Sequence, residues 1–310
     1  MSGDTFFTQL SEVYSNGLYF IWAQFGELVC FLLIAIFFAP RMGEFLGKLS
    51  IAQAMGDLYG KNVQIITSIS AFIGATGMIA MQLKVAGLLF EYCFGMGGFY
   101  GIIMSGLIIT MYSGLGGIRS VTFTDVLQLF TFGTIIPTIA FFILSTAGNV
   151  DIVLNTLTTS EIFDYKKVFD FSNQRSVYYL FLFIFIAAPG FNPAIFQRIA
   201  MAKSTTQVRQ SFTIAAFTCF VLTSITFWIG TIILATKPNI DGNNIVKHII
   251  FDYSFKGIRG LTSADIMAVV MSTADSYINS TSVLVINDFC KPIRSSIIKN
   301  ELIEESGSGQ

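Results

Sequence analysis

The sequence predicts an all-α integral membrane protein. Of its 310 residues, 53% are hydrophobic and only 12% are charged, about half the charged fraction of an average soluble protein. The apolar residues gather in seven segments, each long enough to cross a bilayer as a helix of about 20 residues. These segments lie at 17–39, 64–90, 98–116, 124–147, 176–199, 211–235 and 263–289.

The charge distribution predicts the orientation of these spans. If the first span runs inward, ten Lys/Arg lie on the inner side and seven on the outer side, and the eighteenth is Lys84 within a span. Cytoplasmic connections of membrane proteins carry an excess of Lys/Arg. We therefore expect one transmembrane domain at residues 1–290 and a polar cytoplasmic tail at 291–310.

The composition excludes several classes of protein. A net charge of −1 gives no basic field, so we expect no nucleic-acid partner. Cys30, Cys93, Cys219 and Cys290 are far apart and match neither a disulfide framework nor a metal site, so packing is their expected role. His248, the only histidine, falls in a loop and leaves little for acid–base catalysis. We expect no enzyme activity.

The last apolar segment carries polar groups where lipid-facing residues are expected. Ser272 and Thr273 are adjacent hydroxyls, and Asp275 follows about one turn later. An ionisable side chain at membrane depth normally faces a cavity, an ion or a partner, and oxygen ligands suit a hard cation. The segment therefore predicts an ion path, although membrane hydroxyls also commonly bond to the carbonyl four residues earlier.

The same segment continues with small or polar residues, so that one helix face is polar over about three turns. These residues are Ser276, Asn279, Ser280, Thr281 and Ser282. Hydrocarbon does not solvate such a face. We expect the face to contact protein or water.

The fifth span is interrupted by Pro189, Gly190 and Pro193. Proline removes a backbone donor and clashes with the preceding turn, so the helix should break or unwind there. Unwound backbone survives at membrane depth where it is buried or lines a cavity, and transporters use such breaks to bind solutes and ions. The alternative is a simple proline kink.

Lys84 lies inside the second span. One alternative is that its long side chain snorkels from a lipid-facing position toward the membrane surface. The other is that it faces a pocket and pairs with an acidic group or a substrate.

The sequence GGIRSVTFTDVLQ, at 116–128, separates the third and fourth spans. Gly116 and Gly117 are suited to end one helix, and Thr124 or Asp125 to cap the next. From the residues alone, we expect a well-capped tight turn.

Three segments together resemble the sodium:solute symporter family. They are GGIRSVTFTD, PGFNPAIFQRIAMAKS and AVVMSTADS followed by STSVLVINDF. They occur in the family's order, and the likeness covers most of the chain. The sodium/proline permease branch, found in the bacterial cytoplasmic membrane, looks closest.

The resemblance implies a partial five-plus-five inverted-repeat fold, like that of leucine transporters, preceded here by an N-terminal half-helix. It also implies a sodium site at the last span. Ser272 and Thr273 match hydroxyl ligands, and the carbonyl of Val269 matches a backbone ligand. Asp125 matches an acidic residue that handles sodium near the cytoplasmic side.

Further site residues come from the two helix interruptions that the family uses. Met1 matches a position whose carbonyl binds sodium, and Ser2 and Gly3 continue that motif. Gly190 and Phe191 match the substrate-side break. The chain is shorter than family members at both ends, so we expect a truncated protein that inserts into the bilayer but transports poorly or not at all.

The expected function is sodium-driven symport of a small organic solute, an amino acid such as proline being the first expectation. One alternative is a membrane domain that senses a solute for a signalling protein, which a kinase domain encoded downstream would favour. Another is a non-functional gene remnant, which a frameshift in the flanking DNA would favour. The solute and the oligomeric state are left open.

Overall fold

The computed structural model describes the backbone of residues 2–147, 150–190 and 192–290, with the side chains of all of these except 115–120, 147, 243 and 256. The described residues form helices and connections, without a strand. The α-helices are α1 (Gly3–Asn16), α2 (Ile21–Leu33), α3 (Ile51–Tyr59), α4 (Lys61–Phe94), α5 (Gly98–Ala147), α6 (Val150–Thr159), α7 (Tyr165–Val168), α8 (Gln174–Ala187), α9 (Pro193–Ala200), α10 (Thr205–Thr236), α11 (Ile245–Phe251) and α12 (Lys256–Leu284). Short 3-10 turns and two π-helical turns, at Ile34–Phe38 and Val285–Cys290, join or extend them.

Hydropathy and length single out the membrane-crossing parts. Within the described residues, four helical stretches are long and apolar enough to cross a bilayer: Gly3–Arg41, Lys61–Phe94, Val121–Thr146 and Thr205–Thr236. Shorter apolar stretches occur at Gly98–Gly114 and Gln174–Ala187. Helix α12 is absent from both groups although it has 29 residues, because its polar face lowers its hydropathy.

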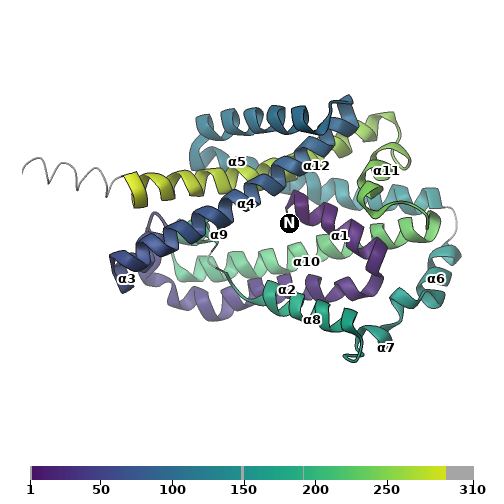
Figure 1. Cartoon of the computed structure of the whole chain (residues 1–310), viewed down its shortest axis with the longest axis horizontal. Coiled ribbons are helices and arrows are strands. Elements are labelled where there is room, and N and C mark those ends of the chain that lie inside the picture. Colours follow the sequence, from purple (N-terminus) through teal and green to yellow (C-terminus); the bar gives the residue numbers. More distant parts are fainter. Residues whose placement is uncertain (1, 148–149, 191, 291–310) are drawn as a thin grey trace, which may run out of the picture.

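Helix α1 lies at the centre of the bundle. Its 14 residues extend about 21 Å, and it packs against α4, α10, α11 and α12. Figure 1 shows the N-terminal end in the middle of the molecule, between α4 and α12 on one side and α10 on the other. The helix ends at Gly17, whose φ of 55° suits glycine, and a Cβ there would lie 2.6 Å from the carbonyl oxygen of Ile162.

Helix α5 differs from the prediction for 116–128 in its caps but not in the reversal of the chain. The chain is helical from Gly98 to Ala147, without the expected helix end and cap. It nevertheless reverses direction, because Tyr112 and Thr124 are hydrogen-bonded through their hydroxyls, whereas a straight helix would hold these two residues about 18 Å apart. The apolar stretches of the two arms, Gly98–Gly114 and Val121–Thr146, therefore correspond to the two predicted spans at 98–116 and 124–147.

The largest apolar cluster joins α1, the second arm of α5, α10, α11 and α12. Leu10, Ile143, Ile229 and Ile249 are fully buried in it. Large apolar side chains elsewhere on α4 and the first arm of α5 are exposed, as is typical of lipid-facing surfaces.

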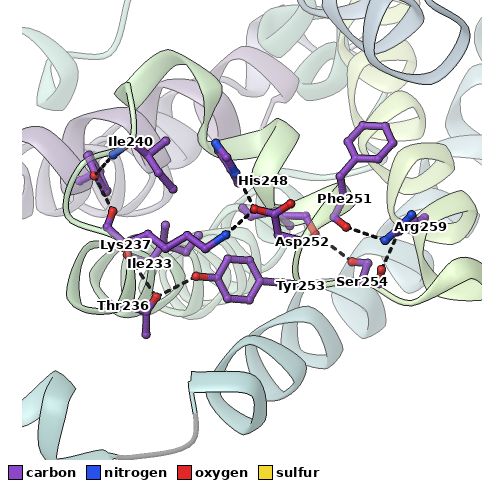
Figure 2. A network of polar contacts seen from close by, with 12 residues as sticks. Ile233, Thr236, Lys237, Ile240, His248, Phe251, Asp252, Tyr253, Ser254 and Arg259 are labelled. Carbon is purple, nitrogen blue, oxygen red and sulfur yellow. Dashed lines mark hydrogen bonds and ion pairs between the residues drawn. The ribbon is translucent and has the colours of Figure 1, made fainter.

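The connection between α10 and α12 is held by a polar network, shown in Figure 2. Asp252 pairs with Lys237 and lies 2.7 Å from His248 Nδ1. Tyr14 of α1 donates to the Lys237 carbonyl at 2.7 Å and accepts from the Ile240 amide at 2.8 Å. This network fixes the end of α1 that lies farthest from its first turn.

Candidate ion and solute site

The predicted interruption of the fifth span is confirmed between α8 and α9. Ala188 has extended backbone angles, φ −74° and ψ 118°. Asn192 then begins α9, because its Oδ1 accepts hydrogen bonds from the amides of Ala194 at 3.0 Å and Ile195 at 3.1 Å. Its Nδ2 donates to the Tyr277 hydroxyl of α12 at 2.6 Å. The break is therefore fixed to α12.

A cavity of about 660 Å³ lies beside this break. Pro189, Gly190, Asn192 and Tyr277 line it, as do Thr5, Gln9, Gln24 and Glu27 with several aromatic and aliphatic side chains from α1, α2 and α8. Such a volume, with few polar groups among apolar ones, is typical of small-molecule sites. Phe191 lies outside the described residues.

The hydroxyls of α12 are both hydrogen-bonded. Ser272 Oγ donates to Asp125 Oδ1 of α5 at 2.5 Å. Thr273 Oγ1 donates to the Val269 carbonyl at 3.2 Å, which is the local alternative considered for membrane hydroxyls. A hydroxyl that donates its proton still has lone pairs that can accept. Both oxygens can therefore bind a cation without losing these hydrogen bonds.

Asp125 does not cap a helix, contrary to the interpretation of 116–128 as a capped turn. Its Oδ2 accepts from Arg198 of α9 at 2.6 Å, and the same guanidinium nitrogen donates to Ser276 Oγ at 2.6 Å. The carboxylate thus joins three helices, since Ser272 also donates to it. Sequence reasoning missed Arg198; the available signal was a cation in the last turn of the helix that follows the break.

The other predicted polar positions of α12 face protein for the most part. Asp275 is fully buried, and its Oδ2 has no hydrogen-bond partner. Ser276 and Ser280 are buried, whereas Ser282 is exposed and donates to the Ile278 carbonyl at 2.8 Å. The expectation of a protein-facing polar stripe is therefore confirmed over most of its length.

The first turn of α1 packs directly on α12. A Cβ added to Gly3 would lie 2.3 Å from Val270 Cγ2, so only glycine fits this contact without a shift. Ser2 Oγ donates to Asp4 Oδ1 at 2.5 Å, and Gln82 Nε2 donates to the same oxygen at 2.5 Å. Met1, predicted to supply a carbonyl ligand, lies outside the described residues.

Lys84 is exposed on α4 and does not line the cavity. This exposed position agrees with the alternative of a side chain that snorkels from a lipid-facing surface, and it gives no support to a pocket-facing charge.

The broken helix, the cavity beside it and the oxygen-rich face of α12 are features that membrane transporters use to bind solutes and ions. The chain belongs to the sodium:solute symporter family, whose model matches residues 1–307. Membership of this family supports sodium as the co-transported ion. The sequence resemblance is confirmed at the level of the family.

Several characterised proteins share this similarity. The human sodium/iodide cotransporter is 22% identical over 94% of this chain and 48% of its own length. The high-affinity choline transporter 1 of Torpedo marmorata is 27% identical over 87% of this chain and 48% of its own length. The sodium/glucose cotransporter of Vibrio parahaemolyticus is 23% identical over 94% of this chain and 59% of its own length. The chain thus spans about half the length of these relatives.

A solved structure shows the same fold. It is the substrate-bound outward-open state of a Na⁺-coupled sialic acid symporter, with a TM-score of 0.81 over 93% of this chain and 64% of that one, at 20% identity.

Proposed function

We propose that this chain forms the ion- and solute-binding part of a sodium-coupled symporter for a small solute in the cytoplasmic membrane, with its C-terminal end on the cytoplasmic side. The observation that carries the proposal is the contact of Gly3 with Val270. It brings the start of α1 beside the oxygens of α12, next to a cavity at the broken helix.

The sodium ion binds between α1 and α12 in this proposal. The Val269 carbonyl and the hydroxyls of Ser272 and Thr273 supply oxygens from α12, and the backbone at Met1 supplies one from α1. Asp125 supports the site because it accepts a hydrogen bond from the Ser272 hydroxyl. The lone pairs of that hydroxyl oxygen remain available to the ion. All of these ligands are hard oxygen donors, as sodium prefers.

The solute binds in the cavity beside Pro189 and Gly190. Gln9 lines this cavity, and its Nε2 donates to the Thr223 carbonyl at 2.6 Å. Relatives are named for iodide, choline and glucose, and none of these names supports an amino acid such as proline. We therefore propose a small solute without assigning it to the amino acids.

Sodium binding and solute binding are coupled because both ligands contact α1 and α12. Sodium joins α1 to α12, and the solute contacts α1, the break and Tyr277 of α12. A ligand favours a conformation only by binding it more tightly than the alternative. Each ligand that stabilises the contact of α1 with α12 therefore raises the affinity for the other.

Binding of radiolabelled sodium to the chain in phospholipid liposomes tests this proposal. We expect saturable binding that excess unlabelled sodium displaces and that potassium does not. Radiolabelled choline, glucose, iodide and proline, each tested with and without sodium, then report the solute class. Absence of saturable sodium binding would overturn the proposal.

A further inference from the structure

Glu27 of α2 places a charge in the wall of the cavity beside the broken helix. It lies within the apolar stretch Gly3–Arg41, which is long enough to cross a bilayer, and it is half-buried. Gly26, the residue before it, packs against α8, since a Cβ there would lie 3.1 Å from Ile186 Cβ. Helix α8 ends at Ala187, directly before the break. This contact therefore holds the backbone of Glu27 beside the break.

The Glu27 carboxylate lacks a cationic partner in the described part of the chain. It is the only charged group among the described residues that line the cavity. None of the described residues forms an ion pair or a hydrogen bond with it. Arg198 of α9 does not line the cavity and pairs with Asp125 instead. An ionised side chain at membrane depth normally has a partner, so a ligand that supplies one is expected here.

The amide side chains in the same wall are already bonded to protein. Gln24 precedes Glu27 by about one turn of α2, and its Nε2 donates to Ser224 Oγ of α10 at 2.6 Å. The amide nitrogens of Gln9 and Asn192 donate to other protein oxygens at the same distance. These hydrogen bonds leave the negative charge of Glu27 unbalanced.

Aromatic rings form another part of the wall. Phe20 and Phe31 of α2, Phe185 of α8 and Tyr277 of α12 line the cavity. Phe31 follows Glu27 by four residues, so the two side chains share one side of α2. The face of an aromatic ring attracts a cation, and aromatic pockets recognise quaternary ammonium groups. The carboxylate would repel an anion, and a neutral solute would leave its charge uncompensated.

We propose that the solute is a small organic cation, a substituted ammonium ion whose charge lies against Glu27. This inference rests on the solute site of the proposed function and adds the charge of the solute to it. The volume of about 660 Å³ accommodates a small molecule of this kind. The solute and the sodium ion are bound by different groups, since Glu27 is not among the proposed sodium ligands.

Two compounds of the same shape test the charge of the solute. One is choline, and the other is the neutral alcohol in which carbon replaces the quaternary nitrogen of choline. The unfolding temperature of the full chain is measured with sodium in a non-ionic detergent while each compound is titrated, because a ligand of the folded state raises it. We expect choline to bind at least about tenfold more tightly than the alcohol. Equal binding of the two, tighter binding of glucose or iodide, or no saturable effect of choline would overturn the inference.

Glu27→Gln removes the charge and keeps the shape of the side chain. We expect its affinity for choline to fall about tenfold or more, with the affinity for the alcohol unchanged. Glu44→Gln is the matched control, because Glu44 is exposed in the turn Gly43–Phe45 and does not line the cavity. It should bind choline as the wild type does. The same choline affinity in both variants would contradict the assignment of the charge to Glu27.

Sodium binding separates this inference from the proposed function. Without solute, the wild type and Glu27→Gln should bind radiolabelled sodium equally in liposomes, which also shows that the variant is folded. A wild type that binds sodium saturably but does not prefer choline to the alcohol would overturn the inference alone. A wild type that binds no sodium would overturn the proposed function, and the comparison of choline with the alcohol would still decide the charge that the cavity accepts.

Discussion

Asp125 of α5 accepts a hydrogen bond of 2.5 Å from Ser272 of α12, which is 147 positions away in the sequence. The same carboxylate pairs with Arg198 of α9. The segment that follows the helix break is thereby connected to both α5 and the oxygen-rich face of α12.

The Asp125–Ser272 hydrogen bond should contribute measurably to stability. In a double-mutant cycle of Asp125→Asn and Ser272→Ala, we expect a coupling energy of about 1 kcal/mol, since the acceptor is charged and partly buried. The midpoints of unfolding of the four proteins in detergent provide the measurement. Strict additivity of the two single changes would mean that this bond is not formed.

Asn192 should stabilise the break in two separable ways. Asn192→Ala removes both the helix cap and the bond to Tyr277, and should lower the free energy of unfolding by about 1 kcal/mol or more. Asn192→Asp keeps the capping oxygen and loses the donor to Tyr277. Tyr277→Phe loses the same bond from the other side. Equal losses for Asn192→Ala and Asn192→Asp would show that the cap contributes nothing.

The loop network of Figure 2 should make stability depend on pH. Hydrogen bonds from Lys237 and His248 lower the pKa of Asp252 below its ordinary value of 3.8. A lowered pKa in the folded state stabilises the fold above the unfolded pKa, and this stabilisation disappears as the pH falls through the folded pKa.

Comparison with Asp252→Asn tests this pH dependence. Unfolding temperatures of the two proteins should differ near neutral pH and converge below about pH 4. A difference that stays constant down to about pH 3 would contradict the assigned pKa shift.

Gly3 should tolerate no side chain. Gly3→Ala places a Cβ against Val270 and Gln82, and overpacking of this kind costs about 1–3 kcal/mol. Gly74→Ala on α4 is the control, because a Cβ at Gly74 meets no atom within 4 Å. The unfolding temperature should fall in the first variant and stay level or rise in the second. Similar values for both variants would argue against a close contact between α1 and α12.

The features that the sequence predicted correctly are local ones. Proline lacks a backbone donor and therefore interrupts a helix whatever the helix packs against. The break at Pro189, Gly190 and Pro193 could for this reason be predicted from the sequence. The polar stripe of α12 was expected to avoid lipid for a similarly general reason. In both cases the deciding residues are neighbours in the sequence.

The remaining features depend on which helices meet. Asp125 appeared to be a helix cap because its contact with Arg198 exists only after α5 and α9 are packed together. The exposed position of Lys84 depends on the rotation of α4 about its axis.

The sodium dependence of Thr273 variants tests the central claim most directly. Thr273→Ala removes a proposed ligand from α12 and should raise the sodium concentration at half-saturation about tenfold, whereas Thr273→Ser retains the hydroxyl and should stay close to the wild type. Binding of radiolabelled sodium in liposomes measures both. An unchanged half-saturation for Thr273→Ala would contradict the assignment of the ion to the contact between α1 and α12.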